Sequence, residues 1–238
     1  MLEILDHRET EKGVLTLQKR NDRTLNQDVF EIKLNDEFLM TSAFVQSEEE
    51  LARHALATLD RDNLKVLIGG LGLGYTACAA LENDSVGSVI VVEALAPVIE
   101  WHQGAILPLG ARLFRDPRCS VVNEDFFTFI GEAHGREAVK AEQLYDAILI
   151  DIDHSPAAVL NADHAWFYEV SGLQSINHHL VPGGVVAIWS NEPPDQEFID
   201  RLETAVGQAR AEPVTFINPY QQNEVVQTVY LATASGQE

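Results

Sequence analysis

The chain has 238 residues, 46% of them apolar, and its 37 acidic against 16 basic residues give a formal net charge of −21. This length suits one large domain or one domain with a small appendage, and the acidic balance excludes nucleic acid as a partner because phosphate binding needs clustered Lys and Arg. No apolar run is long enough to span a bilayer and the first residues hold no apolar leader, so we expect no membrane partner and a cytoplasmic location.

The first sixty residues differ in pattern from the rest of the chain. Short β-branched and aromatic runs predict strands over Val14–Lys19, Val29–Leu34 and Glu37–Thr41. Ser47, with Glu50 three residues later, has the spacing of a capping box and predicts a helix that runs to Leu59. We therefore expect a small β-rich N-terminal unit over residues 1–46 and a second domain over residues 47–238.

After Asp60, apolar runs typical of strands alternate with helical patterns. Strands are predicted over Lys65–Gly69, Ser88–Glu93, Cys119–Asn123, Tyr145–Asp151, Val185–Trp189, Val214–Ile217 and Val225–Ala232. Helices are predicted over Thr76–Leu81, Ala96–Gln103, Phe126–Ala133, Trp166–Leu180 and Asp195–Arg210. Near-continuous Val, Ile and Leu strands between helices indicate an α/β fold whose mostly parallel sheet is covered on both faces. Ligands of such sheets bind at the carboxyl ends of the strands.

The first strand of this series runs into a glycine-rich turn. Gly70, Gly72 and Gly74 allow the backbone to approach a ligand closely, and the start of the next helix favours polar or negative groups. The same turn would also serve simply to pack a helix tightly on a strand. A dinucleotide fingerprint has a third glycine where this chain has Tyr75, so the spacing disfavours a nicotinamide cofactor.

Acidic residues follow the next two strands. Glu93 lies roughly 20 residues after the glycine turn and suits a ribose diol as an acceptor of hydrogen bonds, although an ordinary surface glutamate would give the same pattern. Asp125 is placed to accept from an adenine amino group while Phe126 lies against the ring. Asp125 also fits the N-cap of the next helix, and the two roles are compatible.

The fourth strand ends in a loop with the strongest catalytic candidates, Asp151, Asp153 and His154. A carboxylate that follows five apolar residues is partly desolvated, which raises its pKa towards that of a useful base. The competing interpretation is a polar loop in which Asp151 caps the backbone. Neither this spacing nor the two cysteines, Cys78 and Cys119, matches a metal site, so we expect no metal.

Taken in order, these pieces resemble the spermidine synthase family (polyamine aminopropyltransferases) and its relatives among the class I S-adenosylmethionine-dependent methyltransferases. The resemblance covers roughly residues 28–190. It rests on Leu67-Ile68-Gly69-Gly70, Val91-Val92-Glu93, Asp116-Pro117-Arg118, Glu124-Asp125, Tyr145-Asp146-Ala147-Ile148 with Asp151, Phe167-Tyr168 and Leu180-Val181-Pro182-Gly183-Gly184.

The resemblance implies a Rossmann-like class I methyltransferase sheet with a final antiparallel strand, Val225–Ala232. It implies ribose contact at Glu93, adenine contact at Asp125 and a base or amine-binding acid at Asp151. The implied ligand is S-adenosylmethionine, its decarboxylated form or methylthioadenosine. The β-rich N-terminal unit matches the small domain that supports oligomers in this family, and we expect a homodimer.

Three positions depart from the aminopropyltransferase pattern. Leu73 stands where the glycine loop of these enzymes has an Asp, and His154 replaces their second loop Asp. The Tyr-Gln or Tyr-His pair expected near Ala52-Arg53 is missing, and an Arg there would repel a polyamine. All three changes fall in the amine site, while the residues expected to bind the adenosyl group are kept.

Three hypotheses follow. The leading one is an S-adenosylmethionine-dependent methyltransferase that acts on a small acceptor, with Asp151, Asp153 or His154 as the base. The acidic surface charge would attract a cationic acceptor. The alternative is a polyamine aminopropyltransferase that uses decarboxylated S-adenosylmethionine and has a rebuilt amine site. A second alternative is a non-catalytic nucleotide-binding or assembly module. The aromatic residues Trp166, Tyr168 and Trp189 are candidates for the wall of the acceptor pocket.

Overall fold

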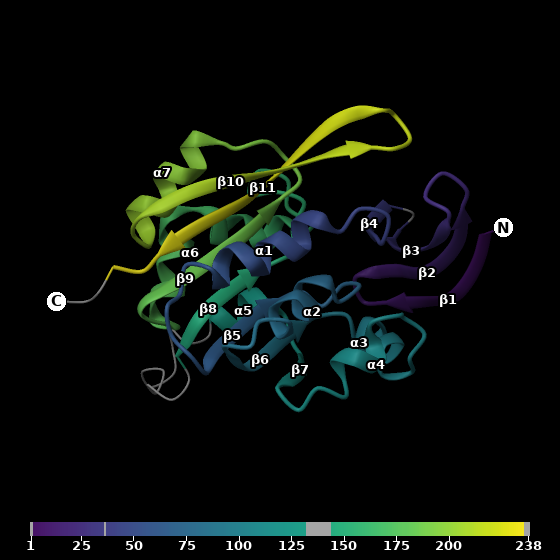
Figure 1. The fold of residues 1–238 in the computed structure, drawn as a ribbon, viewed down its shortest axis with the longest axis horizontal. Helices are drawn as coiled ribbons and strands as arrows, with labels where there is room; N and C mark the ends of the chain where they lie inside the picture. The colour runs from purple at the N-terminus through teal and green to yellow at the C-terminus, as the bar shows by residue number, and fades with distance from the viewer. Residues whose placement is uncertain (1, 36, 132–143, 236–238) are drawn as a thin grey trace.

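The computed structural model describes residues 2–35, 37–131 and 144–235, which form two sheets joined by helix α1, Gln46–Leu56 (Figure 1). The first sheet is antiparallel in the order β1-β2-β3-β4. Its strands are β1 (Leu2–Thr10), β2 (Gly13–Asp22), β3 (Gln27–Leu34) and β4 (Glu37–Thr41). The predicted β-rich N-terminal unit is therefore this sheet, while the division of the chain at residue 46 stays a prediction.

The second sheet has seven strands in the order β10-β11-β9-β8-β5-β6-β7, with β11 antiparallel to both of its neighbours. The strands are β5 (Leu64–Gly69), β6 (Val86–Glu93), β7 (Cys119–Asn123), β8 (Tyr145–Ile150), β9 (Leu180–Ser190), β10 (Ala209–Asn218) and β11 (Asn223–Thr233). The pairs among β5, β6, β7, β8 and β9 are all parallel. The predicted Rossmann-like fold class, with a final antiparallel strand, is confirmed.

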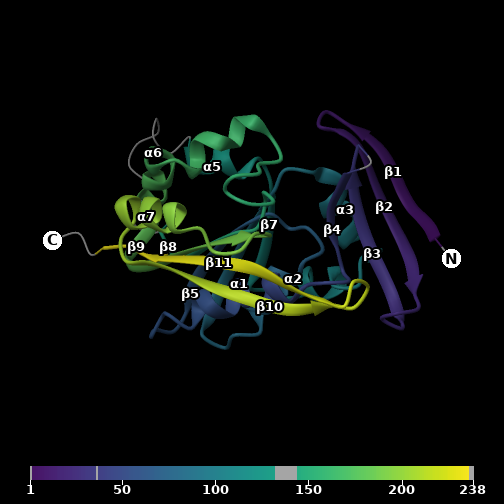
Figure 2. The ribbon, with the colours of Figure 1, turned by 90° about the horizontal axis from the view of Figure 1, so that it is seen from above.

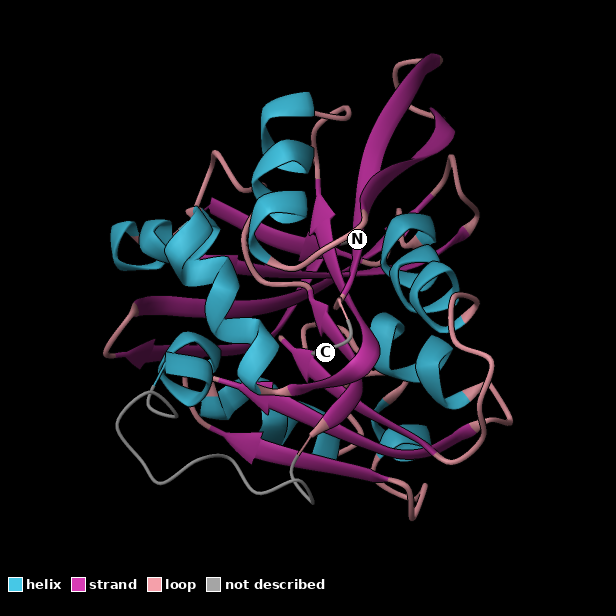
Figure 3. Cartoon of the chain, turned by 90° about the vertical axis from the view of Figure 1, so that its left-hand side faces the viewer, coloured by secondary structure: helices cyan, strands magenta, loops and turns pink. Residues whose placement is uncertain are grey.

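Helices cover both faces of this sheet (Figure 3). Alternate residues of a strand point to opposite faces, so Val66 and Ile68 of β5 join one hydrophobic cluster with residues of α1, α2 and α3, while Leu67 joins a second cluster with residues of α5, η3, α6 and α7. The helices are α2 (Tyr75–Leu81), α3 (Ala96–Gln103), α4 (Gly110–Leu113), α5 (Phe126–Gly131), η3 (Ala162–Tyr168), α6 (Val170–Gln174), η4 (Ser175–His178) and α7 (Gln196–Ala205).

The N-terminal sheet stands across one end of the large sheet, and the β10–β11 hairpin reaches towards it (Figure 2). Residues of both sheets line the same cavities at this end, where the parallel strands finish. The carboxyl ends of β5, β6 and β8, where the sequence places the candidate site, are therefore covered by the N-terminal sheet.

Two features at the start of the chain were not foreseen. Strand β1 was not predicted, because it is an edge strand with half-buried or exposed side chains, and its second half is a run of polar and charged residues without an apolar pattern. The capping box at Ser47 is wrong: α1 follows Val45, with no side-chain cap, and the Ser47 hydroxyl contacts Glu48 and Gln227 instead. Partners in α1 and β11 therefore compete successfully with the helix N-terminus for this hydroxyl.

The single helix predicted over Trp166–Leu180 is wrong, since this segment is divided among η3, α6 and η4. A Cβ atom at Gly172 would lie 2.3 Å from the Trp166 carbonyl oxygen, so the chain here packs closely on itself. The predicted stop at residues 182–184 lies inside β9. Helix α7 ends at Ala205, five residues earlier than predicted, and β10 begins at Ala209. The predicted end of the α5 helix at Ala133 lies outside the described residues.

Candidate nucleotide and acceptor site

The glycine turn after β5 has the backbone conformation that its sequence predicts. Gly70, Gly72 and Gly74 have φ values of +92°, +48° and +93°, which lie in the region that only glycine adopts freely. A Cβ atom at Gly70 would lie 2.2 Å from the backbone oxygen of Asp151. The missing side chain therefore allows the turn after β5 to touch the loop after β8.

Glu93, the last residue of β6, is buried behind this turn, with 8% of its surface exposed. Its Oε2 atom accepts a hydrogen bond of 2.9 Å from the Leu71 N–H, and its Oε1 atom accepts one of 2.7 Å from the Leu95 N–H. Burial raises the pKa of Glu93, while these backbone bonds and the nearby Lys12 oppose the rise. A carboxylate has about four acceptor positions, and the backbone N–H groups of Leu95, Leu71 and Gly72 take three of them, so capacity remains for one ribose hydroxyl.

Asp125 caps helix α5, as one of the two predicted roles requires. Its Oδ1 atom accepts hydrogen bonds of 3.1 Å from the N–H groups of Phe127 and Thr128, and its Oδ2 atom lies 3.2 Å from the Lys12 ammonium group. Burial acts to raise the pKa of Asp125, but the Thr128 N–H and Lys12 outweigh it and lower the pKa. Phe126 is buried against the backbone of Gly69.

These predicted nucleotide-binding residues meet in one space, which we call the first cavity. It has a volume of about 330 Å³ and lies between the N-terminal sheet and the ends of β5, β6 and β8. Its lining includes Gly70, Gly72, Glu93, Asp125, Phe126, Lys12 and Asp151. The structure therefore brings five of the six predicted nucleotide-binding residues to one cavity, and Gly74 lies beside the adjoining one.

The adjoining space, called the second cavity, has a volume of about 400 Å³. Gly72 and Asp151 line both cavities, so the two meet at the glycine turn and the end of β8. Its ionisable side chains are Arg20, Glu31, Glu48, Tyr75, Asp151, His154 and Tyr220. Of the three aromatic residues suggested for an acceptor pocket, Trp189 lines this cavity, whereas Trp166 and Tyr168 are not among its described lining residues.

Asp151 is the predicted catalytic residue that lies at the junction. The Thr76 hydroxyl, in the first turn of α2, donates a hydrogen bond of 2.7 Å to its Oδ2 atom. Burial raises the pKa of Asp151, and this hydrogen bond opposes the rise because it favours the ionised form. A carboxylate with a raised pKa at the meeting point of two cavities is suited to accept a proton.

Glu48 is a site residue that the sequence did not reveal. It lies in the first turn of α1, lines the second cavity, and interacts electrostatically with Asp151. Burial and then the charge of Asp151 raise the pKa of Glu48. In the sequence, an acidic residue near a helix start is explained by the helix dipole alone. No local signal indicates that this first turn faces the end of β8.

The other two catalytic candidates, Asp153 and His154, differ in their surroundings, because only His154 is among the described residues that line a cavity. Asp153 is 2% exposed and accepts hydrogen bonds of 2.6 Å from the Leu160 N–H and 2.8 Å from the Tyr168 hydroxyl, with His164 Nδ1 3.0 Å away. It is absent from the described residues that line either cavity. His154 lines the second cavity. A catalytic part for Asp153 or His154 stays a prediction, and the bonds of Asp153 show it anchoring the loop.

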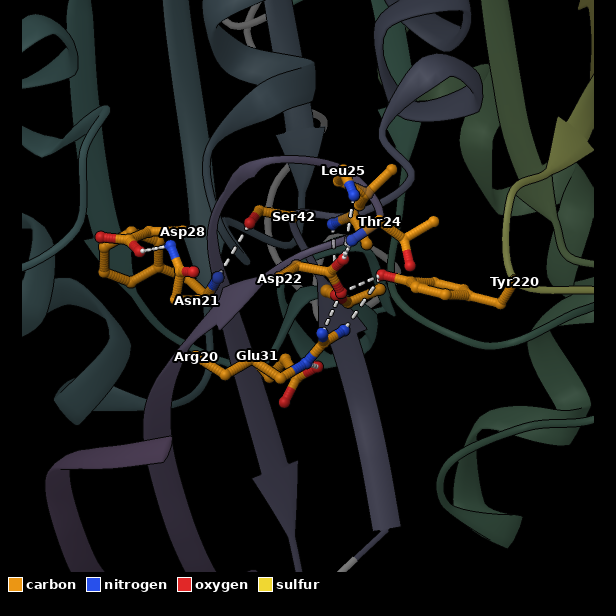
Figure 4. Close-up of polar contacts among 12 residues, drawn as sticks. Arg20, Asn21, Asp22, Thr24, Leu25, Asp28, Glu31, Ser42 and Tyr220 are labelled. Carbon is orange, nitrogen blue, oxygen red and sulfur yellow. Dashed lines mark hydrogen bonds and ion pairs between the residues drawn. The ribbon is translucent and has the colours of Figure 1, made fainter. Parts of the chain in front are cut away.

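The far wall of the second cavity is a charged cluster that joins the two sheets (Figure 4). The Tyr220 hydroxyl donates a hydrogen bond of 2.5 Å to Asp22, and Arg20 contacts Asp22, Glu31 and Tyr220. The hydrogen bonds that Arg20 donates to Tyr220 and then to Glu31 raise the pKa of Arg20. A separate bond, donated by the Tyr220 hydroxyl to Asp22, is the main cause that lowers the pKa of Asp22. The positive charge of Arg20 is thus shared between two carboxylates.

Arg53 is not among the described residues that line this cavity, so the structure gives no support to the expected repulsion of a polyamine by Arg53. Its guanidinium group pairs with Glu49 and Glu50 on the outer side of α1, at 3.0 Å in each case. The neighbouring Ala52 is fully buried. Glu48 is the α1 residue that lines the cavity, so the acid stands one helical turn before the expected position.

Within the described ranges, no three or more His, Cys, Asp and Glu side chains are grouped so that they could hold a metal ion. Among the same residues, no helix is long and apolar enough to cross a membrane.

A seven-stranded sheet of this order, with a glycine turn after β5 and acids at the ends of β6, β7 and β8, defines a Rossmann-like fold of the class I methyltransferase type. Residues 45–235 match the family described as the spermine/spermidine synthase domain, and the chain belongs to this family. The resemblance predicted from the sequence motifs is thereby confirmed.

Two curated relatives differ in the group that their names say they transfer. The chain is 30% identical over 178 residues to polyamine aminopropyltransferase 2 of Pseudomonas aeruginosa, a match to 66% of the chain and 44% of the relative. It is 32% identical over 132 residues to putrescine N-methyltransferase 2 of Nicotiana attenuata, a match to 52% of the chain and 32% of the relative. The chain thus spans less than half the length of each of these relatives.

Solved structures share the fold. Spermidine synthase from Thermotoga maritima has a TM-score of 0.73 at 19% identity, with 98% of this chain and 74% of that chain covered. A spermidine synthase in complex with the transition-state analogue AdoDATO has a TM-score of 0.71 at 19% identity, with 98% and 73% covered. The likeness extends over the N-terminal sheet as well as the large sheet.

Proposed function

We propose that this chain transfers an aminopropyl group from decarboxylated S-adenosylmethionine to an amine. The observation that carries the proposal is the charge of the second cavity. Three carboxyl groups, those of Glu31, Glu48 and Asp151, line it. Arg20 is the one Lys or Arg among the described lining residues, and it is already paired with Asp22 and Glu31. Such a cavity suits ammonium groups and offers no unpaired cation to the carboxylate of S-adenosylmethionine.

The two cavities suit the two halves of this reaction. The adenosyl group fits the first cavity, with a ribose hydroxyl at Glu93 and the adenine at Asp125 and Phe126. The propyl chain then extends past Asp151 into the second cavity. The acceptor nitrogen attacks the propyl carbon bonded to sulfur, the C–S pair of electrons returns to sulfur, and methylthioadenosine leaves. Asp151 takes the proton that the acceptor nitrogen loses.

Methyl transfer, the leading hypothesis from the sequence, remains the second candidate. Leu73 favours it, because this apolar side chain lines the second cavity where an acid would hold an aminopropyl ammonium group. The similarity to a putrescine N-methyltransferase also supports an amine acceptor with a methyl donor. The donor would then carry a carboxylate, and the acidic lining of the second cavity counts against it.

Donor preference separates the two reactions. We would incubate the protein with putrescine and either S-adenosylmethionine or its decarboxylated form, and identify the amine product by mass spectrometry. We expect an aminopropylated product from the decarboxylated donor, lost in Asp151→Asn and kept in Glu50→Gln, a control whose carboxylate pairs with Arg53. A methylated product from S-adenosylmethionine alone would overturn the proposal in favour of methyl transfer. No transferred group from either donor would support a non-catalytic module.

A further inference from the structure

The environment of the Ser47 hydroxyl allows protons to be counted. Ser47 is fully buried, and its Oγ atom has three polar neighbours. The Trp189 indole N–H donates to it at 2.8 Å. Glu48 Oε2 lies 2.8 Å from the hydroxyl oxygen, and Gln227 Oε1 lies 2.6 Å from it. The single Ser47 proton cannot bond to both of these oxygens, so a third proton donor is needed if both contacts are to be hydrogen bonds.

Two of the three neighbours of Ser47, Trp189 and Gln227, can be assigned as donor or acceptor. An indole nitrogen only donates, so Ser47 accepts from Trp189. The Gln227 side chain donates through Nε2 to Asn191 Oδ1 at 2.6 Å, which leaves its Oε1 atom facing Ser47 as an acceptor. A serine hydroxyl has one proton to give. If Glu48 were ionised, two acceptor oxygens would therefore compete for one proton, and one of them would receive no hydrogen bond from this hydroxyl.

A protonated Glu48 resolves this conflict. Its O–H donates to Ser47, and the Ser47 hydroxyl then donates to Gln227, so that all three short contacts become hydrogen bonds. Asp151, the neighbouring carboxyl group, has the opposite environment, because the Thr76 hydroxyl donates to it at 2.7 Å. A donated bond stabilises the ionised form of a carboxyl group. Of the two acids, Asp151 is therefore the one that keeps the negative charge.

We propose that Glu48 carries a proton in the resting protein while Asp151 is ionised, so that this pair presents one negative charge to the acceptor. The position of the proton follows from the contacts of Ser47, whereas its consequence for catalysis rests on the proposed amine transfer. One charge holds one ammonium group. Two charges beside the acceptor would hold its proton more tightly and slow the attack of the nitrogen.

The charged surroundings of Glu48 support this assignment. Asp151 faces it from the end of β8, Glu49 lies next to it on α1, and Tyr75 faces it from α2. Elsewhere on the second cavity lie Arg20, Glu31 and His154. Burial and then the charge of Asp151 raise the pKa of Glu48, while a bond donated by the Ser47 hydroxyl would oppose this rise. Arg20, the cation of this group, is held on the far wall by Asp22 and Glu31.

Infrared spectroscopy locates the proton without any assay of activity. At neutral pH, we expect the wild-type spectrum minus that of Glu48→Gln to contain the carbonyl band of a protonated carboxyl group, shifted in heavy water. The same subtraction with Glu50→Gln, which removes a carboxylate from the outer side of α1, should lack that band. A carboxylate band in place of the protonated one would overturn the proposal. It would mean that the amides of Gln227 and Asn191 are both reversed and supply the missing donor.

The pH profile of turnover tests the consequence. With the acceptor saturating, we expect kcat of the wild-type protein to fall on the alkaline side as Glu48 loses its proton, and we expect Glu48→Gln to lack this fall because its amide cannot ionise. An alkaline fall that is the same in Glu48→Gln would refute the catalytic consequence. If the protein transferred no group at all, the proposed function would fail while the infrared result still located the proton.

Discussion

At Asp151, burial makes the protein less stable as the pH rises. Its pKa is raised in the folded state, so the folded protein binds more protons than the unfolded chain at pH values above about 4, the ordinary pKa of an aspartate. Stability therefore falls as the pH increases through the window between the unfolded and the folded pKa, and stays lowered above it. Glu48 contributes in the same direction.

Removing the Asp151 charge should therefore stabilise the protein. We expect Asp151→Asn to raise the free energy of unfolding by on the order of 1–2 kcal/mol above neutral pH, the scale of a one-unit pKa shift, with a smaller gain in mild acid. The asparagine oxygen still accepts from Thr76. Urea unfolding at a series of pH values measures this, with the exposed Asp200→Asn as control. A gain that does not depend on pH would contradict the raised pKa.

Glu93 should matter for nucleotide binding more than for folding. Its two oxygens hold the glycine turn and the start of the α3 segment, and they line the first cavity. Glu93→Gln has one acceptor oxygen in place of two, so we expect about tenfold or weaker affinity for methylthioadenosine, in line with hydrogen bonds to a charged group. Calorimetric titration measures the affinity, and Glu203→Gln on α7 provides an exposed control. Equal affinity in the two variants would disprove the assignment of Glu93.

At the scale of elements, the glycine turn offers a matched comparison. Gly70 and Gly183 both have positive φ, but a Cβ atom at Gly70 would lie 2.2 Å from the Asp151 carbonyl oxygen, whereas at Gly183 its nearest contact is Arg61 at 3.5 Å. Gly183→Ala should cost about 1–2 kcal/mol through backbone strain alone. Gly70→Ala should cost clearly more, because β5 and the loop after β8 must separate. Denaturant unfolding compares the two variants, and equal losses in the free energy of unfolding would show that the turn can move to accommodate a Cβ atom at Gly70.

The elements that the sequence predicts best are the buried strands, because strands covered on both faces have near-continuous apolar runs that few other structures share. The acids after β6, β7 and β8 then follow from the rule that ligands bind where parallel strands end. Edge strand β1 and the broken helix around Gly172 could not be predicted in this way, since their limits depend on partners distant in sequence. Glu48 was missed for the same reason: its partner, Asp151, is about a hundred residues further along the chain.

At the scale of the whole molecule, the second cavity depends on the docking of one sheet against the other. Tyr220, between β10 and β11, bonds to Asp22 at the end of β2, as Figure 4 shows. Phe44, which follows β4, stacks on Phe216 of β10 with ring centroids 5.6 Å apart and meets Tyr220 edge-on at 5.8 Å. Since Glu31 and Tyr220 belong to different sheets and line the same cavity, its far wall exists only while the sheets stay together.

Deleting one hydroxyl from this junction should therefore affect the acceptor and spare the nucleotide. In Tyr220→Phe the ring keeps its contact with Phe44 but loses the bonds to Asp22 and Arg20. We expect KM for the acceptor to rise about three- to tenfold, the effect of one or two hydrogen bonds, with unchanged affinity for methylthioadenosine in the first cavity. The matched control is Tyr145→Phe, because Tyr145 begins β8 and lies at the end of this strand opposite to Asp151. Hydrogen exchange should also quicken around residues 218–223, because the hairpin is held less firmly. If both ligands weakened equally, the junction would stabilise the whole site and would not shape the far wall of the second cavity in particular.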